Sequence, residues 1–299
     1  MLYLNLAIIG MTEGAVYALL GLGLILIYRS TGVLNFSQAA MAMCSAYVAW
    51  QITTSAPWLT VWGALAITIA FGALMGAGLY YLIFSRLRDS PPVARLIASV
   101  GVAFILPALV RVVWSGQSER GLHLPFQFGS GVVKFSSIAL QVQKLGLIAV
   151  TVGCGIGLHQ WMKRSVTGTA LRAVAQNRMA AQMAGVPERR ISAAAWAIGG
   201  AMAALAGALY VPLAYLDPNM MIPFLPKAFA AALLGGLVNL PMGLVGGLAL
   251  GAVESVFRGM HGSLPRLAET VGALGIVAFL LIRIERFFVS EHELKAIEQ

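Results

Sequence analysis

The sequence predicts an all-α membrane protein, a polytopic bundle of about eight to nine spanning helices. Of its 299 residues, 59% are hydrophobic and only 10% are charged, whereas about a quarter of the residues in a soluble domain carry a charge. No Asp, Glu, Lys or Arg occurs from Ser30 to Ser85. A spanning helix needs about 20 apolar residues, so this run alone holds two or more spans. The alternating pattern of a membrane barrel is absent, which leaves a helical bundle.

Nine apolar segments are candidate spans, and some are short or interrupted. Phe224–Val238 and Gly243–Phe257 are separated by Asn239 and Pro241, so one of them is predicted to be a re-entrant half-helix. Asn35–Ile52, which begins at the polar "LNFSQ", is a second candidate of that kind. The nine are Leu4 to Tyr28, Asn35 to Ile52, Pro57 to Phe84, Ala94 to Trp114, Leu145 to Trp161, Ile191 to Tyr215, Phe224 to Val238, Gly243 to Phe257 and Leu267 to Ile282.

The positive charge predicts the orientation of this single membrane domain (residues 1–299). Two loops, Ser85–Arg95 and Lys163–Arg190, carry nine of the 20 Lys and Arg residues, and two spans separate them. Since Lys and Arg accumulate on cytoplasmic loops, both are expected on the cytoplasmic side of a plasma membrane, the bacterial inner membrane. The C-terminal tail, with Arg283 and Arg286, is expected on the same side, and Ser115–Lys144 becomes the largest external loop. Orientation thus explains the net charge of +9 better than a nucleic-acid partner does.

Loop 163–190 contains a polar helix too short and too charged to span. Thr167 or Thr169 is a candidate N-cap, Gly185 stands at the expected C-terminal position and Pro187 follows, which predicts a surface helix of about 16 residues from Thr169 to Gly185. Two interpretations are open, a helix resting on lipid or a coupling helix inserted into a protein groove. Its apolar stripe is Leu171, Val174, Ala175, Met179 and Met183, its small residues include Ala180 and Ala181, and Arg172 lies away from the stripe.

Two carboxylates fall inside predicted spans, where a central charge costs roughly 2.5 kcal/mol or more and is a functional candidate by default. Glu13 either takes part in a translocation path or reaches the outer interface. Glu254 is explained by an i, i+4 pair with Arg258, one turn further on. Lys227, after two prolines, is either an interfacial lysine or a gate residue.

Three neutral polar residues, Asn35, Ser37 and Gln38, precede an apolar segment. Such groups can line a path for a zwitterion without holding it tightly. They equally suit capping of the next helix, with Asn35 or Ser37 as N-cap, and this is the commoner role.

Glycine spacing predicts close helix contacts. Gly243, Gly247 and Gly251 form a double repeat of the spacing that lets helices approach, and Gly72 and Gly76 form a single pair. No phosphate-binding loop, metal-ligand cluster or nucleophile motif occurs, so neither catalysis nor metal binding is expected of this chain.

Several stretches resemble a known family. Ala180 and Ala181, three residues and Gly185 resemble the Glu-Ala-Ala, three residues, Gly loop of ABC-importer permeases, and "TGTALRAVAQNRMAAQMAGV" is similar to the LivH-type permeases for branched-chain amino acids. Gly14–Gln38, Ala94–Phe104 and Lys227–Ser255 resemble the opening, middle and last third of that family. Met179 replaces the acidic residue of the loop pattern. Ala39 and Ala40 replace the Gly and acidic residue that usually follow Asn-Phe-Ala-Gln or Asn-Phe-Ala-His, which puts the solute in doubt.

The resemblance implies the permease subunit of an ATP-driven importer for branched-chain amino acids or a similar small polar solute. Its partners would be a second homologous permease, two ATP-binding cassette ATPases and an external solute-binding protein. This chain would need no cofactor, because ATP and Mg²⁺ would bind to the ATPases. The alternatives are an ion-coupled secondary carrier, or a permease of the same family for urea, amides or small carboxylates.

Overall fold

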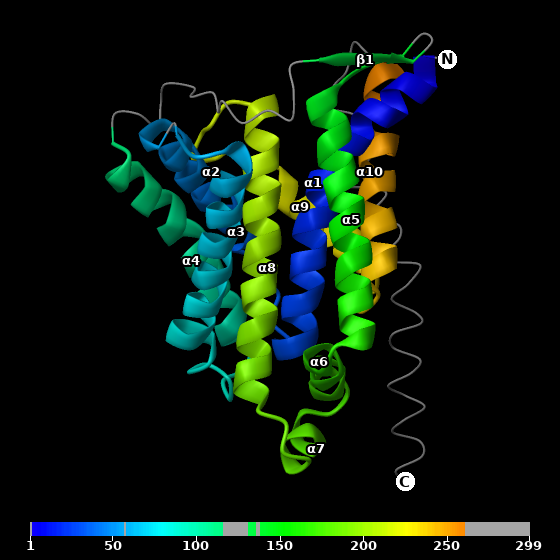
Figure 1. Ribbon diagram of the computed structural model, residues 1–299. Helices are drawn as coiled ribbons and strands as arrows, with labels where there is room; N and C mark the ends of the chain where they lie inside the picture. The colour runs from blue at the N-terminus through cyan, green and yellow to red at the C-terminus, as the bar shows by residue number, and fades with distance from the viewer. Residues whose placement is uncertain (1, 57, 116–130, 136–137, 261–299) are drawn as a thin grey trace.

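A computed structural model describes residues 2–56, 58–115, 131–135 and 138–260. They form a bundle of long helices with a short hairpin at one end and two short helices, α6 and α7, at the other (Figure 1). We call these the hairpin end and the α7 end. The elements are α1 (Leu2–Thr31), α2 (Gln38–Ser55), α3 (Val61–Leu79) with a π-helical turn η1 (Tyr80–Phe84), α4 (Pro92–Val113), β1 (Val132–Phe135), β2 (Ile138–Gln141), α5 (Val142–Arg164), α6 (Val166–Gln176), α7 (Arg178–Met183), α8 (Glu188–Tyr210), the 3₁₀ turn η2 (Val211–Leu213), α9 (Phe224–Leu234) and α10 (Leu240–Met260).

The helical prediction is confirmed, but the predicted number of spans is not. Within the described residues, six helices are long and apolar enough to cross a membrane; α9 is a shorter apolar helix, and α2, with 18 residues, is not among the six. The candidate span Leu267–Ile282 and the tail with Arg283 and Arg286 lie outside the described residues. The antiparallel hairpin β1–β2 falls inside Ser115–Lys144, where the sequence predicts only a loop.

The two predicted half-helix candidates near Pro241 turn out to be unequal. α9 has 11 residues, about 16 Å, and is too short to span. α10 is a continuous helix of 21 residues, so Gly243–Phe257 is part of a full span rather than half of one. Pro241 does not interrupt it, because backbone N–H groups in the first turn of a helix have no acceptor within the helix, so the missing N–H of proline costs no hydrogen bond.

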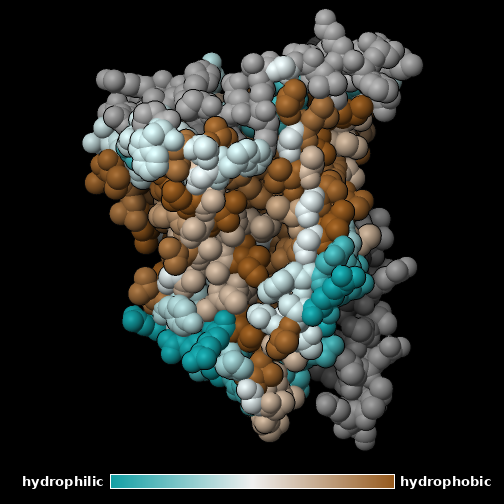
Figure 2. Space-filling view, viewed as in Figure 1, coloured by the Kyte–Doolittle hydropathy of each residue, from teal (hydrophilic) through white to brown (hydrophobic). Residues whose placement is uncertain are grey.

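Helices α1 and α8 form the centre of the bundle. Both are mostly buried, whereas α3, α4 and α5 leave most of their surface uncovered. Those outer helices supply the apolar band that Figure 2 shows around the middle of the molecule, while hydrophilic side chains gather toward the α7 end. This distribution fits a bundle whose outer helices meet lipid or other membrane helices.

Glycines lie at the closest helix crossings. A Cβ added at Gly251 would lie 2.4 Å from the carbonyl oxygen of Gly10, and one at Gly247 would lie 2.7 Å from Cα of Ala18, so α10 packs directly on the α1 backbone. Added Cβ atoms at the other three predicted glycines would meet Ile25 (Gly243), Ala204 and Gly200 (Gly72) and the Trp196 carbonyl (Gly76).

Candidate functional site

The polar stretch at the α7 end is divided into two helices. Asn177 has extended backbone angles, φ −152° and ψ 105°, and its Oδ1 accepts a hydrogen bond from the backbone N of Ala180 at 2.9 Å. The single helix predicted from Thr169 to Gly185 is therefore wrong, because a side-chain cap at Asn177 ends α6 and begins α7. The predicted caps Thr167 and Thr169 are also wrong, since Ser165 caps α6 by accepting from the backbone N of Gly168 at 2.9 Å.

The break separates the predicted apolar stripe into two surfaces. Leu171 and Val174 of α6 are buried in the core of the bundle, whereas Met179 and Met183 of α7 are 71% and 79% exposed. Ala175, Thr169, Ala180 and Gly185 are exposed, Arg172 is half-buried and Ala181 is buried. The exposed apolar surface is thus on α7, which protrudes beyond the ends of the long helices (Figure 1).

Arg172 and Gly168 fix α6 against the end of α5. The Arg172 guanidinium donates to the backbone carbonyl of Met162 and, at 3.1 Å, to the hydroxyl of Thr169. Gly168 packs so closely on Met162 that an added Cβ would lie 2.5 Å from its carbonyl oxygen. Contacts within this chain therefore fix the position of α6.

Glu188, at the start of α8, is a residue that the sequence analysis missed. Its side chain is only 2% exposed and pairs with Arg88 Nη1 at 3.1 Å and with the Arg178 guanidinium. It also accepts a hydrogen bond from Gln182 Nε2 at 2.6 Å. One carboxylate thus joins α7, α8 and the α3–α4 loop. The feature of the sequence that could have revealed it is that Glu188 is the sole acidic residue among the basic residues of loop 163–190.

A second ionic cluster lies inside the bundle, where α1, α9 and α10 meet. Glu254 pairs with Arg258 at 3.0 Å, as its i, i+4 spacing predicts, and also with Lys227 Nζ at 2.5 Å. Arg258 reaches Glu13 at 3.3 Å. The Tyr17 hydroxyl lies 3.0 Å from Glu254 Oε2 and accepts from Lys227 at 3.2 Å. Two carboxylates and two cations make the cluster neutral, and Lys227 ties the short α9 to the spanning helices.

Asn35, Ser37 and Gln38 lie fully inside the chain, with no exposed surface. Ser37 occupies the N-cap position of α2 but makes no side-chain capping bond. Its backbone N donates instead to Asn35 Oδ1 at 3.1 Å. Gln38 Nε2 donates to the carbonyl of Gly199 at 2.9 Å, next to Gly23 in the second half of α1. These residues therefore hold the start of α2 between α1 and α8.

Comparisons with known proteins match the sequence of this chain over nearly its whole length. Residues 6–282 match the family described as branched-chain amino acid transport system / permease component. The chain belongs to this family. Its relatives include the high-affinity branched-chain amino acid transport system permease proteins BraD of Pseudomonas aeruginosa and LivH of Escherichia coli strain K12. BraD is 28% identical over 94% of this chain and 93% of its own length, and LivH is 30% identical over 83% of each. The galactofuranose transporter permease protein YtfT of Escherichia coli is 26% identical over 93% of this chain and 79% of its own.

Family membership confirms the LivH-type identification and the prediction of an ABC-importer permease. The chain is a multi-pass transport protein of the inner membrane. Because the family consists of permease components, membership favours an ATP-driven importer over an ion-coupled carrier.

Proposed function

We propose that this chain forms half of the translocation pathway of an ATP-driven importer for branched-chain amino acids. A second homologous permease forms the other half, two ATP-binding cassette ATPases bind ATP and Mg²⁺, and an external solute-binding protein delivers the solute. The names of BraD and LivH support this solute, while the name of YtfT indicates that similar permeases carry other small polar molecules.

The α7 end faces the cytoplasm in this proposal. Arg88 of the first basic loop pairs with Glu188 of the second, so both loops lie at the same end of the bundle. The two loops therefore add to the same positive-inside bias, which supports a cytoplasmic α7 end and an external hairpin end.

The observation that carries the coupling mechanism is the exposed methionine pair of α7 on a helix joined to the bundle by Glu188. An exposed amphipathic turn suits insertion into a groove of an ATPase. Movement of α7 by the ATPase would pull on Glu188. Because Glu188 belongs to α8 and pairs with Arg88, the movement would reach both α8 and the α3–α4 loop. The bundle would then alternate between outward and inward states, with residues Thr169 to Gly185 as the coupling segment.

Affinity purification of the tagged chain from its native membrane tests this proposal. We expect an ATPase and a second permease to copurify with the wild-type chain. Met179→Glu and Met183→Glu should abolish copurification of the ATPase, because a charge replaces the apolar contact. Trp58→Glu is the control. Trp58 is 81% exposed and lies between α2 and α3, at the other end of the bundle from the coupling segment. Recovery of the wild-type chain alone, or an ATPase retained by both methionine variants, would contradict the coupling role.

A further inference from the structure

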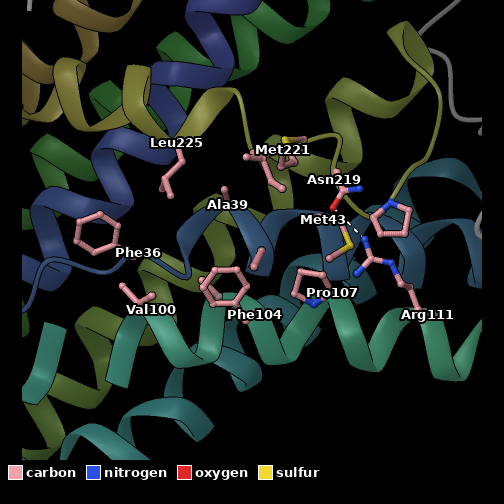
Figure 3. Close-up of a pocket in the computed structure, with 14 residues that line it drawn as sticks. Phe36, Ala39, Met43, Val100, Phe104, Pro107, Arg111, Asn219, Met221 and Leu225 are labelled. Carbon is pink, nitrogen blue, oxygen red and sulfur yellow. Dashed lines mark hydrogen bonds between the residues drawn. The ribbon is translucent and has the colours of Figure 1, made fainter. Parts of the chain in front are cut away.

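An elongated cavity of about 420 Å³ lies between α2, α4 and the turn that precedes α9. Figure 3 shows its axis following α4 from Val100 to Arg111, a distance of about 16 Å along the helix. Its walls are apolar, with Ala39 and Met43 from α2 facing Phe104 of α4. We call this cavity the α2–α4 chamber, and its volume is in the range of small-molecule sites.

Polar groups gather at one end of the chamber, toward the hairpin end of the bundle. Arg111 donates to Asn219 Oδ1 at 3.0 Å, and no ion pair of Arg111 occurs among the described residues. Asp217 accepts from the backbone N of Asn219 at 2.7 Å. The Tyr47 hydroxyl, one turn of α2 beyond the lining residue Met43, is buried and has no hydrogen-bond partner among the described residues. Arg111 and Asn219 therefore line this end of the chamber, and Asp217 and Tyr47 lie next to lining residues in the chain or one helical turn away from them.

Pro107 adds a backbone acceptor to the chamber wall. It lies inside α4, and a proline in a helix interior deprives the carbonyl four residues earlier of its N–H donor. That carbonyl belongs to Ala103, and both residues line the chamber. A carbonyl without its helical partner is costly at membrane depth unless another donor reaches it.

The other end of the chamber is bounded by Phe36, which packs on Phe229. The rings of Phe36 and Phe229 lie with their centroids 4.8 Å apart, and Leu225 lines the wall beside them. Phe229 and Leu225 belong to α9, the same helix whose Lys227 is tied to Glu254. Arg111 thus lies at the end of the chamber toward the hairpin, and Phe36 and α9 bound it toward the α7 end.

We propose that the α2–α4 chamber binds one aliphatic amino acid. The side chain of the solute enters the apolar chamber, its carboxylate binds the Arg111 guanidinium, and its ammonium lies toward Asp217 and the Tyr47 hydroxyl. Arginine suits this role because its planar fork matches a carboxylate. The inference rests on the proposed import function and extends it by assigning this chain a solute site, with α9 as the inner barrier. Phe104 and Ile222 leave one flank open, where the second permease would complete the wall.

Binding of radiolabelled leucine to the purified complex of this chain with its partners tests the site. Isocaproate, which lacks the ammonium, and isoamylamine, which lacks the carboxylate, serve as competitors. We expect each to compete about tenfold or more weakly than leucine, since each loses one charged contact. Arg111→Met should weaken leucine binding by about tenfold or more, and Arg86→Met, an exposed arginine at the α7 end, should leave it unchanged.

A second pair of variants tests the chamber without touching a charge. Ala103→Leu fills the cavity and should abolish leucine binding, whereas Ala108→Leu, on an exposed position of the same helix, should not. An assembled complex that binds no leucine, or binds it equally well in Arg111→Met and Ala103→Leu, would overturn the site while leaving the importer assembly intact. A lipid found by native mass spectrometry in the wild type and lost in Arg111→Met, with leucine binding unchanged, would also overturn it. Failure of the ATPase to copurify would instead count against the proposed function.

Discussion

Glu254 and Glu188 are two buried carboxylates that the fold uses differently. Their side chains are 3% and 2% exposed, and each pairs with two cations. Glu254 lies among helices that cross the membrane, and its partners belong to α9 and α10. Glu188 lies at the α7 end, and its arginine partners belong to a loop and to a helix of six residues.

This difference in location predicts which of the two clusters is rigid and which one moves. An ion pair among apolar helices has no water to replace a lost partner, so the cluster at Glu254 holds α9 in one place. The Glu188 pairs lie at the hydrophilic α7 end, outside the apolar band, where water can replace a lost partner, so they can break and re-form at a smaller cost. We therefore expect the Glu254 cluster to act as a fixed joint and the Glu188 cluster as a connection that changes during transport.

The largest effect is expected for Glu254→Ala. It leaves Lys227 without its carboxylate partner, and breaking a buried pair by removing one partner costs about 3–5 kcal/mol. The measurement is the free energy of unfolding in mixed micelles, titrated with a denaturing detergent. The double variant Lys227→Met, Glu254→Leu removes both charges and should recover much of the loss. A double variant less stable than Glu254→Ala would show that the charges stabilise α9 beyond their mutual pairing.

A smaller loss of stability is expected for Glu188→Gln, about 1–3 kcal/mol, because Arg88 and Arg178 remain partly hydrated when unpaired. The variant should lose transport activity even though it remains folded, since the substitution separates α7 from α8. Rising salt should weaken the Glu188 pairs and leave the Glu254 pairs nearly unchanged. Asp89→Asn is the control, because Asp89 is 92% exposed and pairs with Arg88 at 3.6 Å. Equal salt dependence of both clusters would contradict the comparison.

Gly185→Ala tests the junction between α7 and Glu188 through the backbone alone. Gly185 has φ +80°, and an added Cβ would meet no atom of the described residues within 4 Å, so the cost is the left-handed conformation itself, about 1–2 kcal/mol. Gly157→Ala is the matched control, because a Cβ at Gly157 likewise meets no described residue within 4 Å, but Gly157 lies within α5. There alanine should be neutral or stabilising. Thermal unfolding of both variants measures the contrast, and equal midpoints would contradict the assigned strain.

Sequence reasoning succeeded where structure depends on local spacing. Uncharged runs predict most of the long helices, and i, i+4 spacing predicts the pair of Glu254 with Arg258. It could not find the pair of Glu254 with Lys227, because that contact requires α9 to pack between α1 and α10. The same holds for Glu188 and Arg88, which belong to loops separated by two long helices and meet only in the folded bundle.

The break at Asn177 was missed for a different reason. Helix formers on both sides favour one continuous helix, and the cap at Asn177 competes with it by only about 1 kcal/mol. Such a balance is decided by burial of Leu171 and Val174 against the bundle, which a sequence pattern does not reveal. The apolar stripe was consequently assigned to one surface instead of two.

The smallest effect on stability, about 1 kcal/mol, is expected for Asn177→Ala, which removes this cap. Alanine also favours a helix at position 177, so the population in which α6 and α7 form one straight helix should rise. Spin labels at Val166 and Ala184, both exposed, would then lie about 27 Å apart along the axis, and closer together in the wild type. Asn177→Asp keeps the acceptor and should keep the shorter distance. Because a straight helix would carry Met179 and Met183 away from Glu188, the joined form should also lose the ATPase. Retention of the ATPase by a straightened helix would mean that the methionines, and not the Glu188 connection, are sufficient for docking.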